Sequence, residues 1–382
     1  MNSEALFQQA MQFYAQQNNA AATQALEQSA QMGHPMATLY LAEQYFRVDP
    51  QRAFEFLQRQ WERGVKGTLH RLVTLRAFFT EESLTREDFE FLYAEAQQGH
   101  VESALILLDF TQLHPNSGVF KQLIQQFAPG LLADLGVKVQ SLQESSSLSK
   151  EDKEQLFDFA LSHWQQLGVN TPIISMKACG IRLFQGVYSE LACNYIKLRL
   201  QPHLKPSLVH DPVTGKGIQN DVRTSYIVHV TPEHLDWFAL QLDMILEKLT
   251  GISRARGESM NLLRYENGQQ YKPHYDAIVG QGPHFEQILA DGGQRMRTAI
   301  TYLSKGYIGG ETQFPRLGMQ VNATIGDVLV FDNLDESGNV DRDSYHAGAP
   351  VTEGTKWILT KWIRESATHY GSVVYPKKVN SL

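Results

Sequence analysis

The chain has 382 residues, of which 42% are hydrophobic and 20% charged, with a formal net charge of −7 and a pI of about 6.0. This composition excludes a wholly disordered chain, and the acidic balance argues against a protein that works mainly by gripping phosphate backbones. Two cysteines, Cys179 and Cys193, are too few for a disulfide scaffold, and no apolar run approaches the roughly 18 residues of a membrane span. The N-terminus is rich in glutamine where a secretion signal would be basic and then apolar. We therefore expect a cytoplasmic protein with neither nucleic-acid nor membrane partners.

Residues 1–115 have a helical pattern with a weak repeat. A leucine and an alanine one helical turn apart precede a Gly-His pair at Gly33 and again at Gly99, and a poorer copy between them ends at Gly64. Periods in the thirties are typical of two-helix units stacked into a solenoid, with the glycine ending a helix in the left-handed conformation. The pattern resembles the Sel-like repeat, a relative of the tetratricopeptide repeat. The alternative is an irregular helical bundle.

Residues 116–171 are predicted to form a helical connector. The polar stretch over 141–150 is predicted as a loop. Ser149 is placed to cap the helix that follows, with Asp152 three residues further on, and Gly168 ends that helix.

From residue 172 onward, helices alternate with strands. Ser189 is predicted to begin one helix, and Thr231 with Pro232 to begin a second that runs to Gly251. After Gly251, short strands bounded by Gly, Asn and Asp dominate. Many short strands with few helices predict a β-sandwich or a double-sheet barrel.

Two His-x-Asp triplets are candidates for metal binding. Two histidines and one carboxylate on one face of a metal form the ligand set of non-haem Fe(II) oxygenases. On a strand, residues i and i+2 point to the same side, so both ends of such a triplet can reach one metal ion. His234-Leu235-Asp236 lies in the predicted helix, where this geometry fails. His274-Tyr275-Asp276 lies in a strand-like segment and remains, although a single histidine is more often an ordinary core residue.

The segment from about Phe184 to Arg364 resembles the prolyl 4-hydroxylase group of 2-oxoglutarate- and iron(II)-dependent dioxygenases. The motifs that carry the resemblance are YKPHYD (271–276), GQRMRTAITYLS (293–304), GGETQFP (309–315), GDVLVF (326–331) and HAGAPVTEGTKWILTKW (346–362). The resemblance implies an α+β fold: an N-terminal α-helical repeat domain, then a double-stranded β-helix (jelly-roll) oxygenase domain over residues 172–382.

The resemblance also implies the roles of individual residues. Fe(II) would be bound by His274, Asp276 and His346. The distal carboxylate of 2-oxoglutarate would pair with Lys356, ten residues after His346. Further contacts to this cosubstrate would come from Tyr265, Tyr302 and Thr312. The substrate would be contacted by Arg223, in the stretch VRTS, and by Trp362.

The activity implied by the resemblance is hydroxylation of prolyl residues in a protein or peptide, with O2 and 2-oxoglutarate consumed, succinate and CO2 released, and L-ascorbate as a further cofactor. The helical repeats would recruit the substrate protein. Two alternatives stay open: the same chemistry on a non-prolyl side chain, a free amino acid or a small metabolite, and an interaction protein whose oxygenase domain is inert. The segment between Asp276 and Arg295 departs from the family pattern, and as a lid it would affect the choice of substrate.

Overall fold

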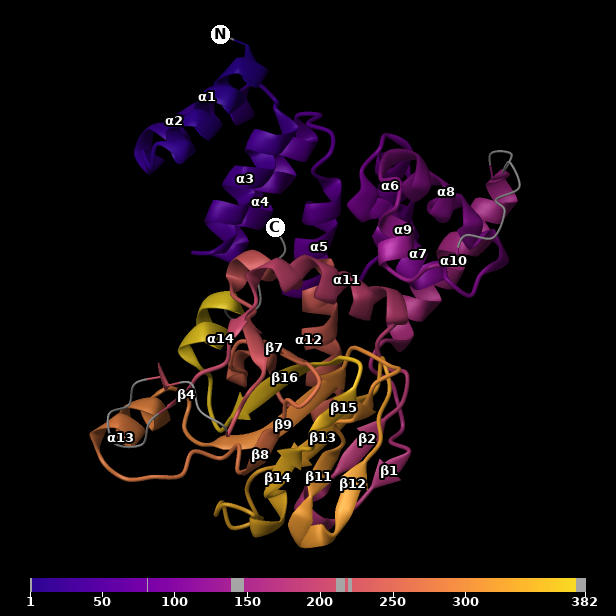
Figure 1. The fold of residues 1–382 in the computed structure, drawn as a ribbon. Helices are drawn as coiled ribbons and strands as arrows, with labels where there is room; N and C mark the ends of the chain where they lie inside the picture. Colours follow the sequence, from indigo (N-terminus) through magenta and orange to yellow (C-terminus); the bar gives the residue numbers. More distant parts are fainter. Residues whose placement is uncertain (1, 81, 139–147, 211–216, 219–221, 376–382) are drawn as a thin grey trace. The chain divides into compact units, whose positions relative to one another are not determined.

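The computed structural model of the chain describes residues 2–80, 82–138, 148–210, 217–218 and 222–375. The chain divides into two compact units, one made of residues 1–166 with 373–382 and the other of residues 167–372. All the described strands belong to the second unit (Figure 1). The finer division into repeats, connector and oxygenase domain stays a prediction.

The first unit is helical throughout its described part. Its helices are α1 (Ser3–Ala15), α2 (Asn19–Gln31), α3 (Pro35–Phe46), α4 (Pro50–Glu62), α5 (Leu69–Phe79), α6 (Arg86–Gln97), α7 (Val101–Thr111), α8 (Gly118–Phe127), α9 (Leu131–Asp134) and α10 (Lys150–Gln166). The repeat glycines Gly33, Gly64 and Gly99 follow α2, α4 and α6 with φ angles of 81°, 83° and 99°. Each therefore ends its helix in the left-handed conformation, and the predicted helical repeats are consistent with this all-helical unit.

The start of α10 agrees with the capping prediction. The Ser149 hydroxyl donates to the Asp152 carboxylate over 2.6 Å, and the Asp152 backbone N–H donates back to that hydroxyl over 3.1 Å. The predicted polar loop before it falls mostly on residues 139–147, which lie outside the described residues.

The second unit is built around two antiparallel sheets. Its elements are β1 (Ile174–Ser175), β2 (Arg182–Phe184), α11 (Glu190–Leu200), β3 (Lys205–Pro206), β4 (Val209–His210), β5 (Gly217–Ile218), β6 (Tyr226–His229), α12 (Trp237–Thr250), β7 (Asn261–Tyr265), β8 (Tyr271–His274), α13 (Pro283–Ala290), β9 (Arg295–Tyr302), β10 (Ile308–Gly309), β11 (Thr312–Phe314), β12 (Met319–Val321), β13 (Val328–Asp332), β14 (His346–Gly348), β15 (Val351–Glu353) and β16 (Lys356–Arg364). The last described helix, α14 (His369–Val374), follows β16 and ends beyond the boundary of the unit.

The major sheet has the strand order β1-β2-β13-β9-β16-β7-β6-β3, and the minor sheet has the order β12-β11-β14-β8. One buried apolar cluster joins them, with Tyr265, Tyr302 and Leu329 from the major sheet and Phe314 and Val321 from the minor sheet. Two antiparallel sheets that share a core form the predicted jelly roll, so the α+β fold class is confirmed. β16 lies inside the major sheet, whereas β8 is the last strand of the minor sheet.

The helix predicted from Thr231 begins later than expected. Pro232–His234 form only one 3-10 turn, and α12 starts at Trp237 after the Asp236 carboxylate has capped the backbone N–H of Ala239. Aspartate in an extended conformation is a strong helix start, and here it replaces the Thr-Pro signal. From α12, Asp243 reaches the outer face of β16 and forms a buried ion pair of 3.0 Å with Lys361.

The segment between Asp276 and Arg295 contains the short helix α13, none of whose residues is fully buried. Both ends of the segment are held together, because the Gln294 side chain accepts from the Ile278 N–H over 2.6 Å and donates to the Ile278 carbonyl over 2.8 Å. The predicted loop is thus a helical insertion with a fixed base.

None of the helices in the described part of the chain has both the length and the apolarity needed to cross a bilayer.

Candidate metal and cosubstrate site

A pocket between the two sheets collects most of the side chains that the sequence indicated. The inner face of β16 contributes alternate residues, Lys356, Ile358, Thr360 and Trp362, as the twofold repeat of a strand requires. Further lining residues come from other elements: Arg223, Tyr265, Tyr271, His274, Asp276, Thr312 and His346. The pocket therefore has one wall from each sheet.

His274 ends β8, and a bulge in that strand sets its direction. Pairing with β14 matches His346 to His274 but Gly348 to Tyr271, so β8 carries one extra residue over this interval. Pro273 lies inside the interval and has no N–H to donate, which favours such an irregularity. The bulge puts Tyr271 and His274 on one side, where their rings stack 3.5 Å apart.

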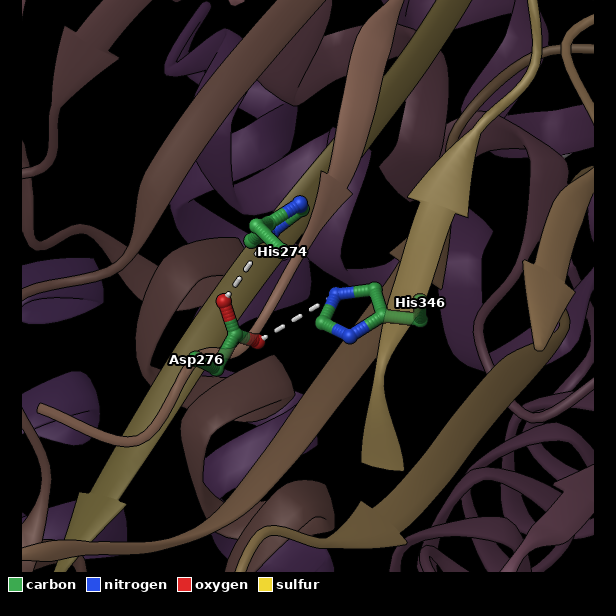
Figure 2. Close-up of side chains that lie close together, drawn as sticks. All are labelled: His274, Asp276 and His346. Carbon is green, nitrogen blue, oxygen red and sulfur yellow. Dashed lines mark ion pairs between the residues drawn. The ribbon is translucent and has the colours of Figure 1, made fainter. Parts of the chain in front are cut away.

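Asp276 was expected on the same strand as His274, but the strand ends before it. The carboxylate nevertheless reaches both histidines. Asp276 Oδ1 lies 3.4 Å from His274 Nε2, and Asp276 Oδ2 lies 3.6 Å from His346 Nε2 (Figure 2). The ligand atoms of these three residues all lie within 4.8 Å of one another.

The second nitrogen of each histidine ring is held by the backbone. Nδ1 of His274 lies 2.9 Å from the carbonyl of Lys272, and Nδ1 of His346 lies 2.9 Å from the carbonyl of Ser344. A carbonyl accepts only, so each ring carries a proton on Nδ1, and its Nε2 is the atom that can offer a lone pair to a metal. Both lone pairs are on the nitrogens that lie beside Asp276.

The charges in the cluster fit a divalent cation. Burial raises the pKa of the Asp276 carboxyl, but His346, His274 and Arg295 lower it by more, so the carboxyl is ionised at neutral pH. Burial and the neighbouring His274 lower the pKa of His346 to about 4, so that ring is neutral. Two imidazole lone pairs and one carboxylate on one side of the pocket are the donor set of non-haem Fe(II) sites, and these residues fit that ion.

Lys356 is the buried cation of the pocket. Its side chain is 3% exposed, and its Nζ donates to the Gly310 carbonyl over 2.6 Å. Among the described residues it forms no ion pair, and burial lowers the pKa of its ammonium to about 8, although Glu311 acts in the opposite direction. Gly310 has a φ of 69°, and a Cβ there would lie 3.1 Å from Lys356 Cδ, so glycine is needed for this approach.

The predicted cosubstrate residues lie around the same ammonium. Tyr265 is opposite Lys356 in the pairing of β7 with β16, and Nζ lies 5.7 Å from the centre of the Tyr265 ring. Tyr302 is 1% exposed, and its hydroxyl shares a 2.7 Å hydrogen bond with that of Thr312. Thr312 lines the pocket directly, whereas Tyr302 supports it from behind.

The two predicted substrate residues, Arg223 and Trp362, both line the pocket. Arg223 pairs with Tyr271, and its guanidinium lies 4.9 Å from that ring. The Nε and Nη2 atoms of Arg223 are buried and have no hydrogen-bond partner among the residues described. Trp362 lies under the Arg295 guanidinium, which is 3.7 Å from a Trp362 ring centre.

Other histidines considered from the sequence lie elsewhere. The His234 ring lies against the His203 ring at a tilt of 58°, and Asp236 forms an ion pair with Arg199. His369 begins α14, where its backbone N–H donates to Asp291. Within the described chain, the triad of His274, Asp276 and His346 is the group found with metal-ligand geometry.

Three residues near the site were not singled out from the sequence. Tyr271 faces the site only because of the bulge, and Thr298 donates to Asp276 Oδ2 over 2.7 Å from a different strand. Arg295 donates to the main-chain carbonyl of Asp276 over 3.3 Å. Thr298 and Arg295 both lie in the motif GQRMRTAITYLS, so the motif located them without giving their roles.

Known proteins resemble this chain in the same region. Residues 260–364 match the family described as the 2OG-Fe(II) oxygenase superfamily. Prolyl 4-hydroxylase 1 of Arabidopsis thaliana is 35% identical over 190 residues, which cover 46% of this chain and 65% of the relative. A probable prolyl 4-hydroxylase 3 of the same plant is 32% identical over 200 residues, which cover 47% and 68%.

A solved structure of the viral collagen prolyl hydroxylase vCPH from Paramecium Bursaria Chlorella virus-1 has 24% sequence identity and a TM-score of 0.38, over 48% of this chain and 95% of that one. The chain spans less than two thirds of prolyl 4-hydroxylase 1 but slightly more than two thirds of the second relative. The predicted resemblance is therefore confirmed: the chain belongs to the 2OG-Fe(II) oxygenase superfamily and to its prolyl 4-hydroxylase-like group.

Proposed function

We propose that this protein is a 2-oxoglutarate- and Fe(II)-dependent dioxygenase that hydroxylates prolyl residues of a protein or peptide. The observation that carries the proposal is the convergence, in one pocket, of a metal-ligand triad and a buried ammonium that has no counter-ion among the described residues. A triad alone is consistent with many metals, and a buried lysine alone with a structural role. Together they provide the two binding functions that this chemistry needs.

His274, Asp276 and His346 would hold Fe(II). The chemistry that Fe(II) supplies when bound is the activation of O2, coupled to oxidation of 2-oxoglutarate to succinate and CO2, with one oxygen atom transferred to the substrate. The family uses Fe(II), 2-oxoglutarate, O2 and ascorbate, in agreement with the predicted cofactors. The Lys272 and Ser344 carbonyls keep both rings in the tautomer that this role requires.

Lys356 would bind the distal carboxylate of 2-oxoglutarate. The described residues provide no counter-ion for this ammonium, and the carboxylate of 2-oxoglutarate would be one. The ion pair would be strong because the buried site has a low dielectric constant. Tyr265 and Thr312 border the same volume and offer hydroxyls as donors. Tyr302 would act through Thr312.

Arg223 and Trp362 would receive the substrate. The unpaired donors of Arg223 suit a backbone carbonyl, and the Trp362 ring offers an apolar face to a pyrrolidine ring. The relatives are named prolyl 4-hydroxylases, which supports a prolyl substrate rather than a free metabolite.

The helical repeats would recruit the substrate protein. In the first unit, a groove between α1 and α3 is lined by Met11, Tyr14, Met36, Leu39 and Tyr40. Met36 and Tyr40 are 46% and 42% exposed, so the groove presents apolar surface to a partner. We also propose a cytoplasmic location, which is supported by the low cysteine content of the chain, two residues in 382. Fractionation of the cells that produce the protein tests this location.

Mass spectrometry tests the activity. The protein is incubated with Fe(II), 2-oxoglutarate, ascorbate and a set of proline-containing peptides, and succinate is measured in parallel. We expect a one-oxygen mass increase that fragment spectra place on proline. Oxygen found only on another residue or on a free metabolite would refute the prolyl assignment but leave the oxygenase assignment standing.

Replacement of a metal ligand is the matching control. His346→Ala is expected to abolish both peptide oxidation and succinate release, while the thermal unfolding midpoint stays within a few degrees of the parent protein. Full succinate release by a folded His346→Ala protein would contradict the assigned metal site.

A further inference from the structure

We infer that Thr298 and Asn333 are positioning residues, which hold the Asp276 carboxylate with Oδ2 anchored and Oδ1 left for the metal. The inference rests on the proposed function, because it assigns a task to residues behind the metal site. It concerns Asp276 in particular, because this ligand has the weakest backbone support of the three.

His274 and His346 are strand residues that face each other across the pairing of β8 with β14, and backbone carbonyls orient their rings. Asp276 lies beyond the end of β8. Its side chain is held instead by the Thr298 hydroxyl on β9, which lies 2.7 Å from Oδ2. The direction of the carboxylate therefore depends on a contact with another strand.

The Asn333 side chain fixes the orientation of the Thr298 hydroxyl group. Its Nδ2 donates to Thr298 Oγ1 over 2.9 Å. A hydroxyl has one proton to give, and the Asp276 carboxylate can only accept. The amide must therefore present its NH2 group to Thr298, and the Thr298 proton is directed to Asp276 Oδ2. The three groups form a one-way series of donors that ends on the carboxylate.

The series is buried inside the second unit. Thr298 and Asn333 are each 0% exposed and Asp276 is 5% exposed, so solvent cannot replace these donors. Asn333 Oδ1 is buried and, among the residues described, has no hydrogen-bond partner. An apolar side chain would avoid that unsatisfied acceptor, so packing alone does not account for the amide.

Oδ2 accepts the Thr298 proton and lies 3.6 Å from His346 Nε2, whereas Oδ1 does not contact Thr298 and lies 3.4 Å from His274 Nε2. A carboxylate anchored at one oxygen cannot rotate to offer the other, and this favours one-oxygen coordination. Replacing a residue that hydrogen-bonds a metal ligand typically lowers metal affinity by about 10–100-fold.

Metal affinity is the readout, measured on the full chain without cosubstrate and with Co(II) as the probe, by calorimetric titration. Thr298→Val keeps the shape of the side chain and removes the donor, whereas Thr298→Ser keeps the donor. The matched control is Thr301→Val, because Thr301 lies on the opposite face of β9, is 0% exposed and has a hydroxyl with no hydrogen-bond partner in the described structure. Asn333→Asp replaces the donor amide with an acceptor that competes for the Thr298 proton.

We expect Thr298→Val and Asn333→Asp to weaken Co(II) binding by at least about tenfold. Thr298→Ser and Thr301→Val should stay within about threefold of the parent protein. The loss in Asn333→Asp would be the more telling result, because an added negative charge near a cation would otherwise tighten binding.

Two results would overturn the inference: Thr298→Val binding Co(II) as the parent does, or Thr301→Val losing as much affinity as Thr298→Val. The unfolding midpoint of each variant identifies any loss of Co(II) affinity that comes from misfolding. If Thr298→Val misfolds, the Co(II) affinity of Thr298→Ser is compared with that of the parent protein instead. If the parent protein itself fails to bind Co(II), the proposed function falls, and this inference falls with it.

Discussion

The ammonium of Lys356 lies buried in the pocket and has no counter-ion in the described structure. Burying such a charge costs free energy of folding. Burial lowers the pKa of Lys356 to about 8, with Glu311 opposing part of the shift. The side chain is therefore charged at pH 7 but loses its proton within about two pH units above that. Only the charged form binds a carboxylate strongly, so the proposed role of Lys356 predicts how the affinity for the cosubstrate changes with pH.

We expect the apparent KM for 2-oxoglutarate to be constant below pH 7 and to rise about tenfold between pH 7 and pH 9. The sign follows from the lowered pKa, because deprotonation above pH 8 removes the binding charge. Lys356→Arg keeps its charge throughout this range, so its KM should stay flat over the same pH values. Steady-state assays of succinate formation give both profiles, and a rise of equal size in Lys356→Arg would assign the pH effect to another group.

Single residues differ in how far the sequence could predict them. The metal ligands and Lys356 could be predicted from two motifs. One motif contains His274 and Asp276, and the other contains His346 and Lys356. Within each motif the spacing between the two residues is short and fixed. Thr298 and Asn333 were not named, because their contacts join residues 22 and 35 positions apart in the chain. A hydroxyl and an amide inside strands have no sequence pattern of their own, and only the pairing of β9 with β13 shows their purpose.

At the scale of elements, the insertion that carries α13 is fastened more firmly than a loop. Besides the contacts of Gln294, the Arg364 guanidinium donates to the Gly293 carbonyl over 2.5 Å and to Glu258 over 2.5 Å. Glu258 also holds Arg295, the residue that lies over Trp362. A cation beside the last carbonyls of a helix stabilises that end. The Arg364 guanidinium is also linked, through Glu258 and Arg295, to Trp362 in the wall of the pocket.

Arg364→Met should loosen α13 without unfolding the sheet. We expect amide exchange in residues 284–290 to accelerate by about tenfold, the equivalent of about 1.4 kcal/mol, because a buried charge-assisted contact is lost. Exchange along β16 should change much less. Hydrogen–deuterium exchange with mass spectrometry compares this variant with Arg342→Met, whose side chain is exposed. Unchanged exchange in α13 would show that Gln294 alone fixes the insertion.

In the first unit, α5 begins without a cap of its own. Thr68 makes no capping hydrogen bond, and the Glu95 carboxylate from α6 accepts instead from the backbone N–H groups of Leu69 and His70 over 2.9 and 3.0 Å. Burial raises the pKa of Glu95, but the His70 side chain and these two donors outweigh it and lower the pKa to about 2. The folded state therefore favours the ionised carboxyl.

Because the folded pKa is below the usual value, Glu95 stabilises the helices fully above pH 4.5, and this contribution is lost as the pH falls toward 2. The shift corresponds to about 3 kcal/mol. Glu95→Gln should lower the thermal midpoint of the helical signal at pH 7 and flatten its dependence on acid below pH 4.5. Circular dichroism melts across this range test it, with the exposed Glu27→Gln as the control. An acid dependence as steep as that of the parent would contradict this account.

The elements themselves were predicted best where the local signals agreed. Ser189 caps α11 and Ser149 caps α10, as expected from cap residues at the start of an apolar stripe. The Thr231 signal failed because Asp236, a stronger cap five residues later, begins α12 instead. The bulge in β8 was not predicted, since only the pairing with β14 reveals an extra residue.

On the scale of the whole molecule, every residue of the candidate site lies in the unit of residues 167–372. No described residue of the first unit lines this pocket. Its proposed contribution is affinity for a large substrate, a form of bivalent binding in which one site recruits and another reacts.

A fragment of residues 167–382 should therefore retain the release of succinate that occurs without substrate, within about twofold of the full chain. Its KM for short proline peptides should also be unchanged, whereas its KM for the cognate protein should rise at least about tenfold. The comparison needs assays of all three reactions on fragment and full chain. An equal KM for the protein substrate would remove the recruiting role from the repeats, and loss of succinate release by the folded fragment would show that the repeats complete the site.

The position of β8 at the end of the minor sheet has a consequence for how the protein ages. Among the described residues, the outer side of β8 pairs with a short segment, through the Lys272 N–H to the Val222 carbonyl and the Thr224 N–H to the Gln270 carbonyl. The strand that carries Lys356 has a full neighbour on each side. Local opening costs least where a strand has few pairing partners, so we expect warming or storage to open β8 first and to release the metal of the proposed site while the bulk of the sheet persists. A preparation that has lost its activity in this way is a metal-depleted protein rather than a denatured one, and fresh Fe(II) should restore it.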